Sequence, residues 1–154
     1  MSVVTELILN ADSEARYPAP KRTENISRFF KNRRPKNSHC QNIGTNEQQI
    51  VQNGSMRFWE RCPNTPSNSG NERKTASCQR DQGWYVRLVA YSILAGSEKP
   101  LEEIGTLGIK EMYNNLEIPL RNLVEAMRCV KEEAVSMMSE EDVVEVGPYF
   151  DYII

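Results

Sequence analysis

The amino-acid sequence predicts an all-α protein, and two observations support this prediction. From about residue 73 onward, apolar residues recur at the three- and four-residue spacing of helices. No segment keeps the apolar–polar alternation of a half-buried strand. With 154 residues, the chain is long enough for one domain with a substantial hydrophobic core.

The first predicted helix lies within residues 1–17. Its apolar face combines four residues: Val3, Val4, Leu7 and Ile8. This segment has no basic leader and no small-residue cleavage site, so we do not expect a signal peptide. No apolar run approaches the roughly 20 residues that a membrane span needs.

Residues 20–70 show weaker helical patterning. A possible helix around residues 26–30 is expected to be interrupted by Pro35. A second helix is predicted over residues 45–61, where Gly54 should cost about 1 kcal/mol relative to alanine. The following loop, rich in Pro, Asn and Ser, could be a lid or a simple connection.

A long central helix is predicted from Thr75 to Ala95. Gly83 is the only weak helix former in this segment, and its apolar residues cover more than one face. Such a distribution indicates a helix that is largely buried. Gly96 follows as a C-cap, and Gly105 marks a place for a sharp turn or a close approach to a ligand.

Two further helices are predicted near the C-terminus. Pro119 opens the first, in which apolar residues keep the helical rhythm as far as Met138. Ser139 and Asp142 resemble a capping box at the start of the second. Pro148 should kink this last helix or begin its final segment.

Charge is balanced overall but unevenly placed. The chain has 19 basic and 21 acidic residues, which gives no general reason to expect a nucleic-acid partner. Residues 21–36 are strongly basic and could meet an acidic or phosphate surface, although a solvated helix face is the more common explanation. His39, the only histidine, should be exposed, and no helix face offers an axial histidine for haem.

The four cysteines are far apart in the sequence. They form no C-x-x-C pair, so neither a disulfide framework nor a zinc site is expected. Cys40, Cys62 and Cys129 should be structural or exposed free thiols.

Cys78 has the most suggestive neighbours. At about 100° per residue, Cys78, Asp81 and Tyr85 share one side of a helix, whereas Arg80 would have to curl round to join them. The thiol could hold a linear tetrapyrrole, the carboxylate could accept pyrrole N–H groups, and the guanidinium could bind a propionate. The Trp84 ring, beside Tyr85, could pack against the pigment and restrict its twisting. Spacing alone favours a buried structural cysteine beside an ordinary ion pair over a pigment site.

A longer stretch of sequence favours the pigment site over the structural cysteine. The run from Cys78 to Gly96, CQRDQGWYVRLVAYSILAG, resembles the bilin-attachment helix of phycobiliproteins. The similarity continues at residues 100–113, 140–142 and 148–154, and the opening residues 1–18 also resemble that family. Within it, these segments are most similar to allophycocyanin α subunits, particularly the red-shifted α-B type.

The resemblance implies a globin-like helical domain, residues 21–154, in a single phycobiliprotein-like unit. Residues 1–20 would belong to a helical hairpin that pairs with an allophycocyanin β-type subunit. Phycocyanobilin would be thioether-linked at Cys78, with Arg80 on a propionate and Asp81 on the central pyrrole nitrogens. The residues implied at the pigment are Cys78, Arg80, Asp81, Trp84, Tyr85 and Tyr113.

The function implied is light harvesting rather than catalysis. The subunit would pass excitation energy toward chlorophyll photosystems, in assemblies with linker proteins on the cytoplasmic (stromal) face of the thylakoid membrane. A bilin-free structural or regulatory relative that caps an antenna assembly is the alternative. The presence of Cys78, Arg80 and Asp81 together favours the pigment carrier. A bilin-processing enzyme would need an acid–base pair that the thiol lacks.

Residues 20–70 match the family poorly. Because the pigment helix is retained beside an altered first half, we hypothesise a far-red-absorbing variant. Such a variant could assemble into helical filaments rather than ordinary rings.

Overall fold

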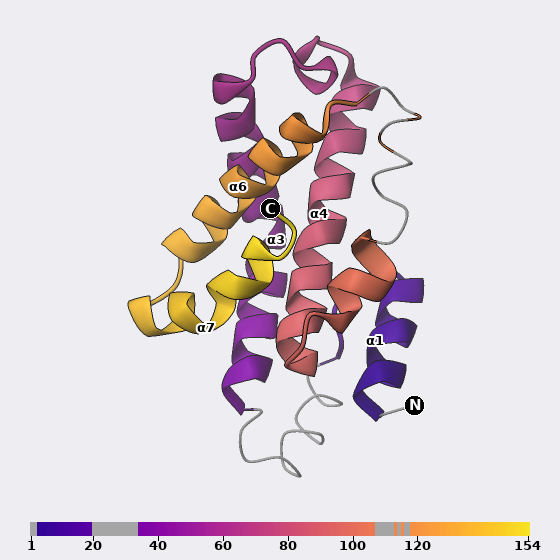
Figure 1. Ribbon diagram of the computed structural model, residues 1–154, viewed down its shortest axis with the longest axis vertical. Coiled ribbons are helices and arrows are strands. Elements are labelled where there is room, and N and C mark those ends of the chain that lie inside the picture. Colours follow the sequence, from indigo (N-terminus) through magenta and orange to yellow (C-terminus); the bar gives the residue numbers. More distant parts are fainter. Residues whose placement is uncertain (1–2, 20–33, 107–112, 114, 116–117) are drawn as a thin grey trace.

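The computed structural model describes residues 3–19, 34–106, 113, 115 and 118–154 (Figure 1). The elements are α1 (Val3–Ser13), α3 (Arg34–Arg61), the short 3₁₀ helix η2 (Pro66–Asn68), α4 (Glu72–Ala95), the π-helical turn η3 (Leu101–Thr106), α6 (Leu120–Ser136) and α7 (Glu140–Asp151). No strand occurs in these ranges, and the predicted all-α fold is confirmed.

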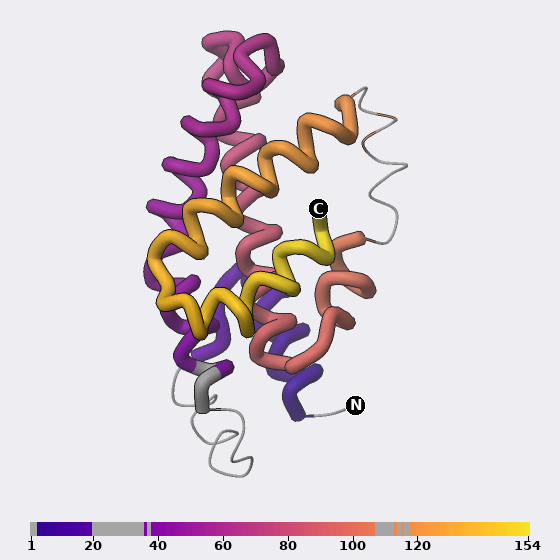
Figure 2. Tube along the Cα trace, turned by 60° about the vertical axis from the view of Figure 1, so that its left-hand side comes forward, coloured from indigo at the N-terminus to yellow at the C-terminus, as the bar shows by residue number. Residues whose placement is uncertain are grey.

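Helix α4 is the centre of the fold. It contacts α1, α3, α6 and α7, and the pair α6–α7 lies across α3 and α4 in both ribbon and tube views (Figures 1 and 2). The Asn71 side chain caps its start by accepting the backbone N–H groups of Arg73 and Lys74 at 3.1 and 3.2 Å. Gly96, with φ of 71°, ends the helix as predicted.

The core confirms that α4 is largely buried. From Tyr85 to Leu94, only Arg87 is not fully buried, because neighbouring helices cover several sides of this half of α4. Gly105 allows η3 to approach it, since a Cβ there would lie 2.7 Å from Leu88 Cδ1. This glycine therefore serves helix packing.

Helix α3 is longer than its sequence pattern predicts. It runs for 28 residues, with Pro35 in its first turn, where a missing N–H is tolerated. Gly54 lies where α3 meets α6, and a Cβ there would be 3.1 Å from the Val130 Cα. Close packing against α6 thus offsets the low helix propensity of glycine. The helix predicted around residues 26–30, and most of the basic segment, lie outside the described residues.

His39 is buried, so the prediction that it is exposed was wrong. Its Nε2 lies 3.4 Å from Glu145 Oε2 and 3.8 Å from Asp142 Oδ1, because α7 packs beside the first turns of α3. Ser139 caps α7 by accepting the Asp142 backbone N–H at 3.2 Å. The helix then continues through Pro148, which does not begin a separate segment.

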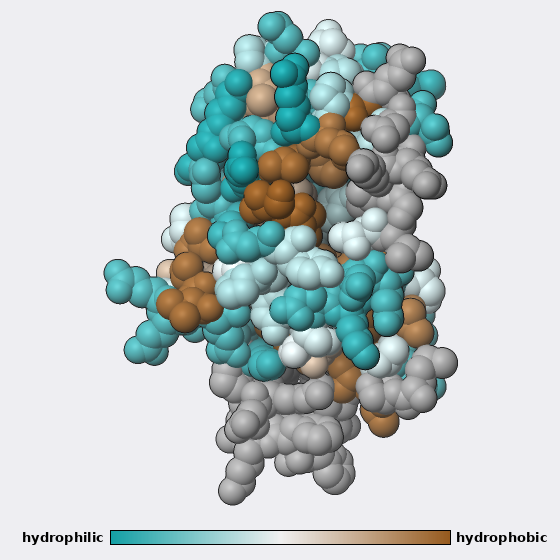
Figure 3. Space-filling model, in the orientation of Figure 1, coloured by the Kyte–Doolittle hydropathy of each residue, from teal (hydrophilic) through white to brown (hydrophobic). Residues whose placement is uncertain are grey.

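The two ends of the chain pack on the same core. Val4, Leu7 and Ile8 of α1 are buried, whereas Val3 is 70% exposed and leaves the predicted apolar face. Figure 3 shows apolar side chains gathered where α6 and the C-terminus meet, and Ile154 is among the partly buried residues that pack on the core. None of the helices in the described ranges is both long and apolar enough to cross a membrane.

Candidate functional site

A cavity of about 410 Å³ lies along one half of α4. The end of α3, the η2 turn, Tyr113, Ile118 and the first turns of α6 close its other sides. Its volume falls within the range of about 300–1,000 Å³ that small-molecule sites occupy. Apolar and polar groups share its wall: Phe58, Ser67, Cys78, Asp81, Gln82, Tyr85, Tyr113, Leu123 and Ala126.

Four of the six predicted site residues meet in this cavity. Cys78, Asp81 and Tyr85 line it from α4, in agreement with their spacing on one helical face. Tyr113 lines it from a distant part of the chain. Helical periodicity is local and brings the first three together, whereas only the folded chain adds the fourth.

Arg80 and Trp84 do not line the cavity. The Arg80 side chain is 73% exposed, and its Nε lies 3.5 Å from Asp81 Oδ1. The Trp84 ring packs on the core with its centroid 5.2 Å from that of Tyr85. Trp84 therefore supports the tyrosine from behind, and Arg80 reaches the site only through Asp81.

The Cys78 sulfur has two polar neighbours that the sequence prediction missed. Gln82 Nε2 donates to it at 3.3 Å, and Ser67 lines the same cavity. Burial raises the pKa of the Cys78 thiol above its ordinary value, while Ser67 and Gln82 act in the opposite direction. Gln82 could have been found in the sequence, since it stands four residues after Cys78. Ser67 could not, because its position depends on how the loop folds back onto α4.

The titratable groups opposite the thiol are also perturbed by burial. Burial raises the pKa of Asp81, with Arg80 acting against the rise, and raises that of Tyr113 to about 12. Burial and the nearby Tyr113 raise the pKa of Tyr85 as well. Within the described residues, no hydrogen bond of good geometry satisfies the buried Tyr85 hydroxyl. The cavity thus presents a carboxylate and a thiol between apolar walls, with a buried hydroxyl behind its Tyr85 wall.

Two cationic side chains of the cavity wall were also not predicted from the sequence. Arg73 and Lys74, in the first turn of α4, line the cavity that Arg80 does not reach. A carboxylate of a bound molecule would find cationic partners at this end.

Comparison with the sequences of known proteins finds relatives that match the whole chain. A family model described as "Phycobilisome protein" matches residues 6–154. The chain belongs to the phycobilisome protein family. It is similar to the allophycocyanin alpha-B chain of Cyanophora paradoxa, at 44% identity over 100% of this chain and 97% of that protein. The alpha-B chain of Synechococcus sp. is 41% identical over 100% and 96%, and the allophycocyanin alpha chain of Porphyra purpurea 41% over 100% and 98%.

Family membership settles the general function. This phycobilisome protein is a light-harvesting antenna subunit of the allophycocyanin α type, and it is not an enzyme. A subunit of this type carries phycocyanobilin through a cysteine thioether and pairs with a β subunit, peripherally at the thylakoid surface. The predicted family, fold, function and cofactor are confirmed.

Proposed function

We propose that Cys78 is the attachment thiol and that the cavity beside it holds the pigment of an α-B-like antenna subunit. The observation that carries this proposal is the position of the thiols. Among the four cysteines, all within the described ranges, Cys78 alone lines the cavity. Cys40 and Cys129 are buried in the apolar core, and Cys62 packs against a smaller apolar cluster.

The other predicted residues have roles that follow from their positions. The Asp81 carboxylate faces the cavity and can accept hydrogen bonds from the two central pyrrole N–H groups. Tyr85 and Tyr113 form a wall that restricts twisting of the pigment, and Trp84 supports that wall. Arg80 is exposed enough to turn toward a propionate, with Arg73 as a second cation. When bound, the pigment supplies the absorption of visible light.

We further propose that residues 1–20 pair with the β-type subunit and that residues 21–154 form the globin-like body of one domain. Two apolar side chains of α1 support this assignment: Val3 is 70% exposed and Leu9 is 46% exposed. These exposed side chains leave apolar surface of α1 available to a partner subunit. The assembly would include linker proteins near a photosystem on the cytoplasmic (stromal) face. Far-red absorption and filament assembly are also proposals, which a spectrum and electron micrographs of the assembled complex would test.

A zinc-stained denaturing gel tests the attachment site. The full chain is produced with its β partner in cells that make phycocyanobilin, as wild type, Cys78→Ala and Cys62→Ala. We expect fluorescence from wild type and Cys62→Ala but none from Cys78→Ala. Equal fluorescence from Cys78→Ala would refute attachment at Cys78. A dark wild type would favour the bilin-free structural relative.

A further inference from the structure

Polar side chains from two different elements lie beside the Cys78 sulfur. Gln82, one helical turn further along α4 and only 3% exposed, donates its amide N–H to the sulfur at 3.3 Å. Ser67 of η2, 9% exposed, lines the same cavity and acts to lower the pKa of the thiol. A buried amide N–H needs a hydrogen-bond partner, and here that partner is the sulfur.

Neighbouring side chains fix the orientation of Gln82 and contact Ser67. The buried Ser55 hydroxyl donates to Gln82 Oε1 at 2.9 Å, which leaves the amide N–H₂ of Gln82 for the sulfur. The Trp59 indole donates to the Ser67 oxygen at 3.0 Å, and Thr65 Oγ1 lies 3.3 Å from the same oxygen, where either hydroxyl can be the donor. Ser55 and Trp59 come from α3, which packs along α4.

We propose that Gln82, oriented by Ser55, and the neighbouring Ser67 activate the Cys78 thiol for covalent attachment of the pigment. The inference rests on the proposed function of Cys78 and assigns the residues that make its sulfur reactive. An amide N–H and a hydroxyl beside the sulfur stabilise the negative charge of the thiolate, which is the nucleophilic form.

Attachment is an addition, so it needs no oxidant or reductant. The S–H bond breaks, and a sulfur–carbon bond forms to the unsaturated substituent of the pigment's end ring. The carbon–carbon double bond of that substituent is consumed, and the thiol proton ends on the pigment. Burial opposes loss of this proton, and Gln82 and Ser67 favour it.

Charged and titratable groups around the sulfur must be kept constant in any test. Asp81 raises the pKa of the thiol, and Tyr113 lies close enough to interact with it. Arg73 and Lys74 line the same cavity from α4. Two further thiols, Cys62 just after α3 and Cys129 in α6, share its apolar cluster. Substitution of the two neutral donors leaves all of these groups in place.

Alkylation of the pigment-free full chain measures the activation directly. Iodoacetamide labelling of the Cys78 peptide is followed by mass spectrometry across the alkaline titration of the thiol. Near neutral pH, we expect Gln82→Met and Ser67→Ala each to react roughly three- to tenfold more slowly, because each removes one polar group that favours the thiolate. Half-maximal labelling should move to higher pH, while the rate at the alkaline plateau changes little.

Two variants make the test specific. Gln79→Met, the same chemical change beside Cys78 but outside the cavity lining, should label like wild type. Gln82→Glu places a carboxylate near the sulfur and should react more slowly than Gln82→Met. Circular dichroism restricts the comparison to folded variants.

Rate–pH profiles of wild type, Gln82→Met and Ser67→Ala that superimpose would overturn the inference. If Cys78 still carries the pigment in that case, the proposed attachment site stands and only the activation by Gln82 and Ser67 fails. If the profiles shift as expected but pigment is found on another cysteine, the activation is supported and the proposed attachment site fails. If Gln79→Met is labelled as slowly as Gln82→Met, the inferred activation by Gln82 is also overturned.

Discussion

The Tyr91 hydroxyl donates a 2.7 Å hydrogen bond to the backbone carbonyl of Arg16. The Tyr91 ring is fully buried in the core, so this bond ties the segment after α1 to the central helix. The same segment leads away from α1, the helix that we propose to pair with the β subunit. One buried hydroxyl thus connects the position of α1 to the helix that carries Cys78.

Replacement of that hydroxyl should loosen the N-terminal segment. We expect Tyr91→Phe to lower the free energy of unfolding by about 1–2 kcal/mol, because the carbonyl of Arg16 loses its partner. Urea denaturation measures the loss. Tyr152→Phe, at a tyrosine 45% exposed, is the control and should change stability little. Equal stability of wild type and Tyr91→Phe would contradict this role of the bond.

Gly54→Ala should destabilise the protein although alanine is the better helix former. The added methyl would lie 3.0 Å from Val130 Cγ2 and 3.1 Å from its Cα, and a packed helix backbone gives way only at a cost. We expect a net loss of about 1–2 kcal/mol, after the gain in propensity of up to about 1 kcal/mol. Thermal denaturation beside Gln52→Ala, at an exposed site on the same helix, tests this. A Gly54→Ala variant more stable than wild type would contradict the prediction, because it would mean that α6 can move away from the added methyl at little cost.

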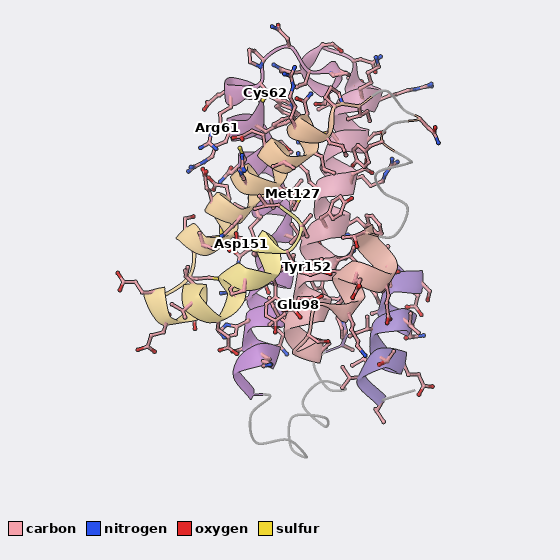
Figure 4. The ribbon with its side chains drawn as sticks, in the orientation of Figure 1. Arg61, Cys62, Glu98, Met127, Asp151 and Tyr152 are labelled. Carbon is pink, nitrogen blue, oxygen red and sulfur yellow. The ribbon has the colours of Figure 1, made fainter. Side chains whose placement is uncertain are left out.

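The ion pairs between α3 and α6 should make a small, pH-dependent contribution. Arg61 Nη2 lies 2.7 Å from Glu132 Oε2, and the Arg61 guanidinium is held beside α6 (Figure 4). Hydrogen bonds from Arg61 lower the pKa of Glu132 below its ordinary value. A lowered folded-state pKa stabilises the fold above the unfolded-state pKa, about 4.3, and this stabilisation disappears as the pH falls through the folded-state value.

Glu132→Gln should therefore lower stability near neutral pH by no more than about 1 kcal/mol, since the Glu132 side chain is 40% exposed and screened. In acid, the difference from wild type should vanish, and molar salt should reduce it at neutral pH. Urea denaturation at several pH values, beside Glu60→Gln, measures it. A stability difference between wild type and Glu132→Gln that grows as the pH falls would contradict this role of the ion pair.

The thiols should differ sharply in reactivity in the native protein. Burial raises the pKa of Cys40 to about 12 and, as the largest of several causes, that of Cys129 to about 11, so their thiolate populations are small. We expect a thiol-specific disulfide reagent at mildly alkaline pH to modify Cys62 and Cys78 in the pigment-free native chain, and all four cysteines in urea. Native labelling of Cys40 as fast as that of Cys62 would contradict the packing of α3.

Asp81→Asn should separate attachment from tuning of the pigment. An amide cannot replace the carboxylate that favours the protonated pyrrole system, while the Cys78 thiol is untouched. We expect zinc fluorescence on a gel to persist and the long-wavelength absorption band to weaken and shift to shorter wavelength. Asp151→Asn, at an exposed residue paired with Lys131, should keep the wild-type spectrum. An unchanged Asp81→Asn spectrum would exclude the proposed contact.

The sequence by itself determined the features that depend on neighbours along the chain. The path of α4, its C-cap at Gly96 and the N-cap at Ser139 follow from local propensity and backbone geometry. The shared face of Cys78 and Asp81 follows from the helical repeat alone. Resemblance over the pigment helix then identified the family before any fold was known.

Only the tertiary structure decided which residues complete the cavity. Arg80 is adjacent to Asp81 in sequence yet lies outside the cavity wall, whereas Tyr113 and Ser67 reach it from distant segments. Gly54 reads as a weak point of a helix but is a contact point between two helices. At Gly54, packing between two helices far apart in the chain overrides a local helix preference worth about 1 kcal/mol. Local spacing therefore placed the thiol, Asp81 and Gln82 on one helix face, and packing between separate segments added Ser67 and Tyr113 to the cavity.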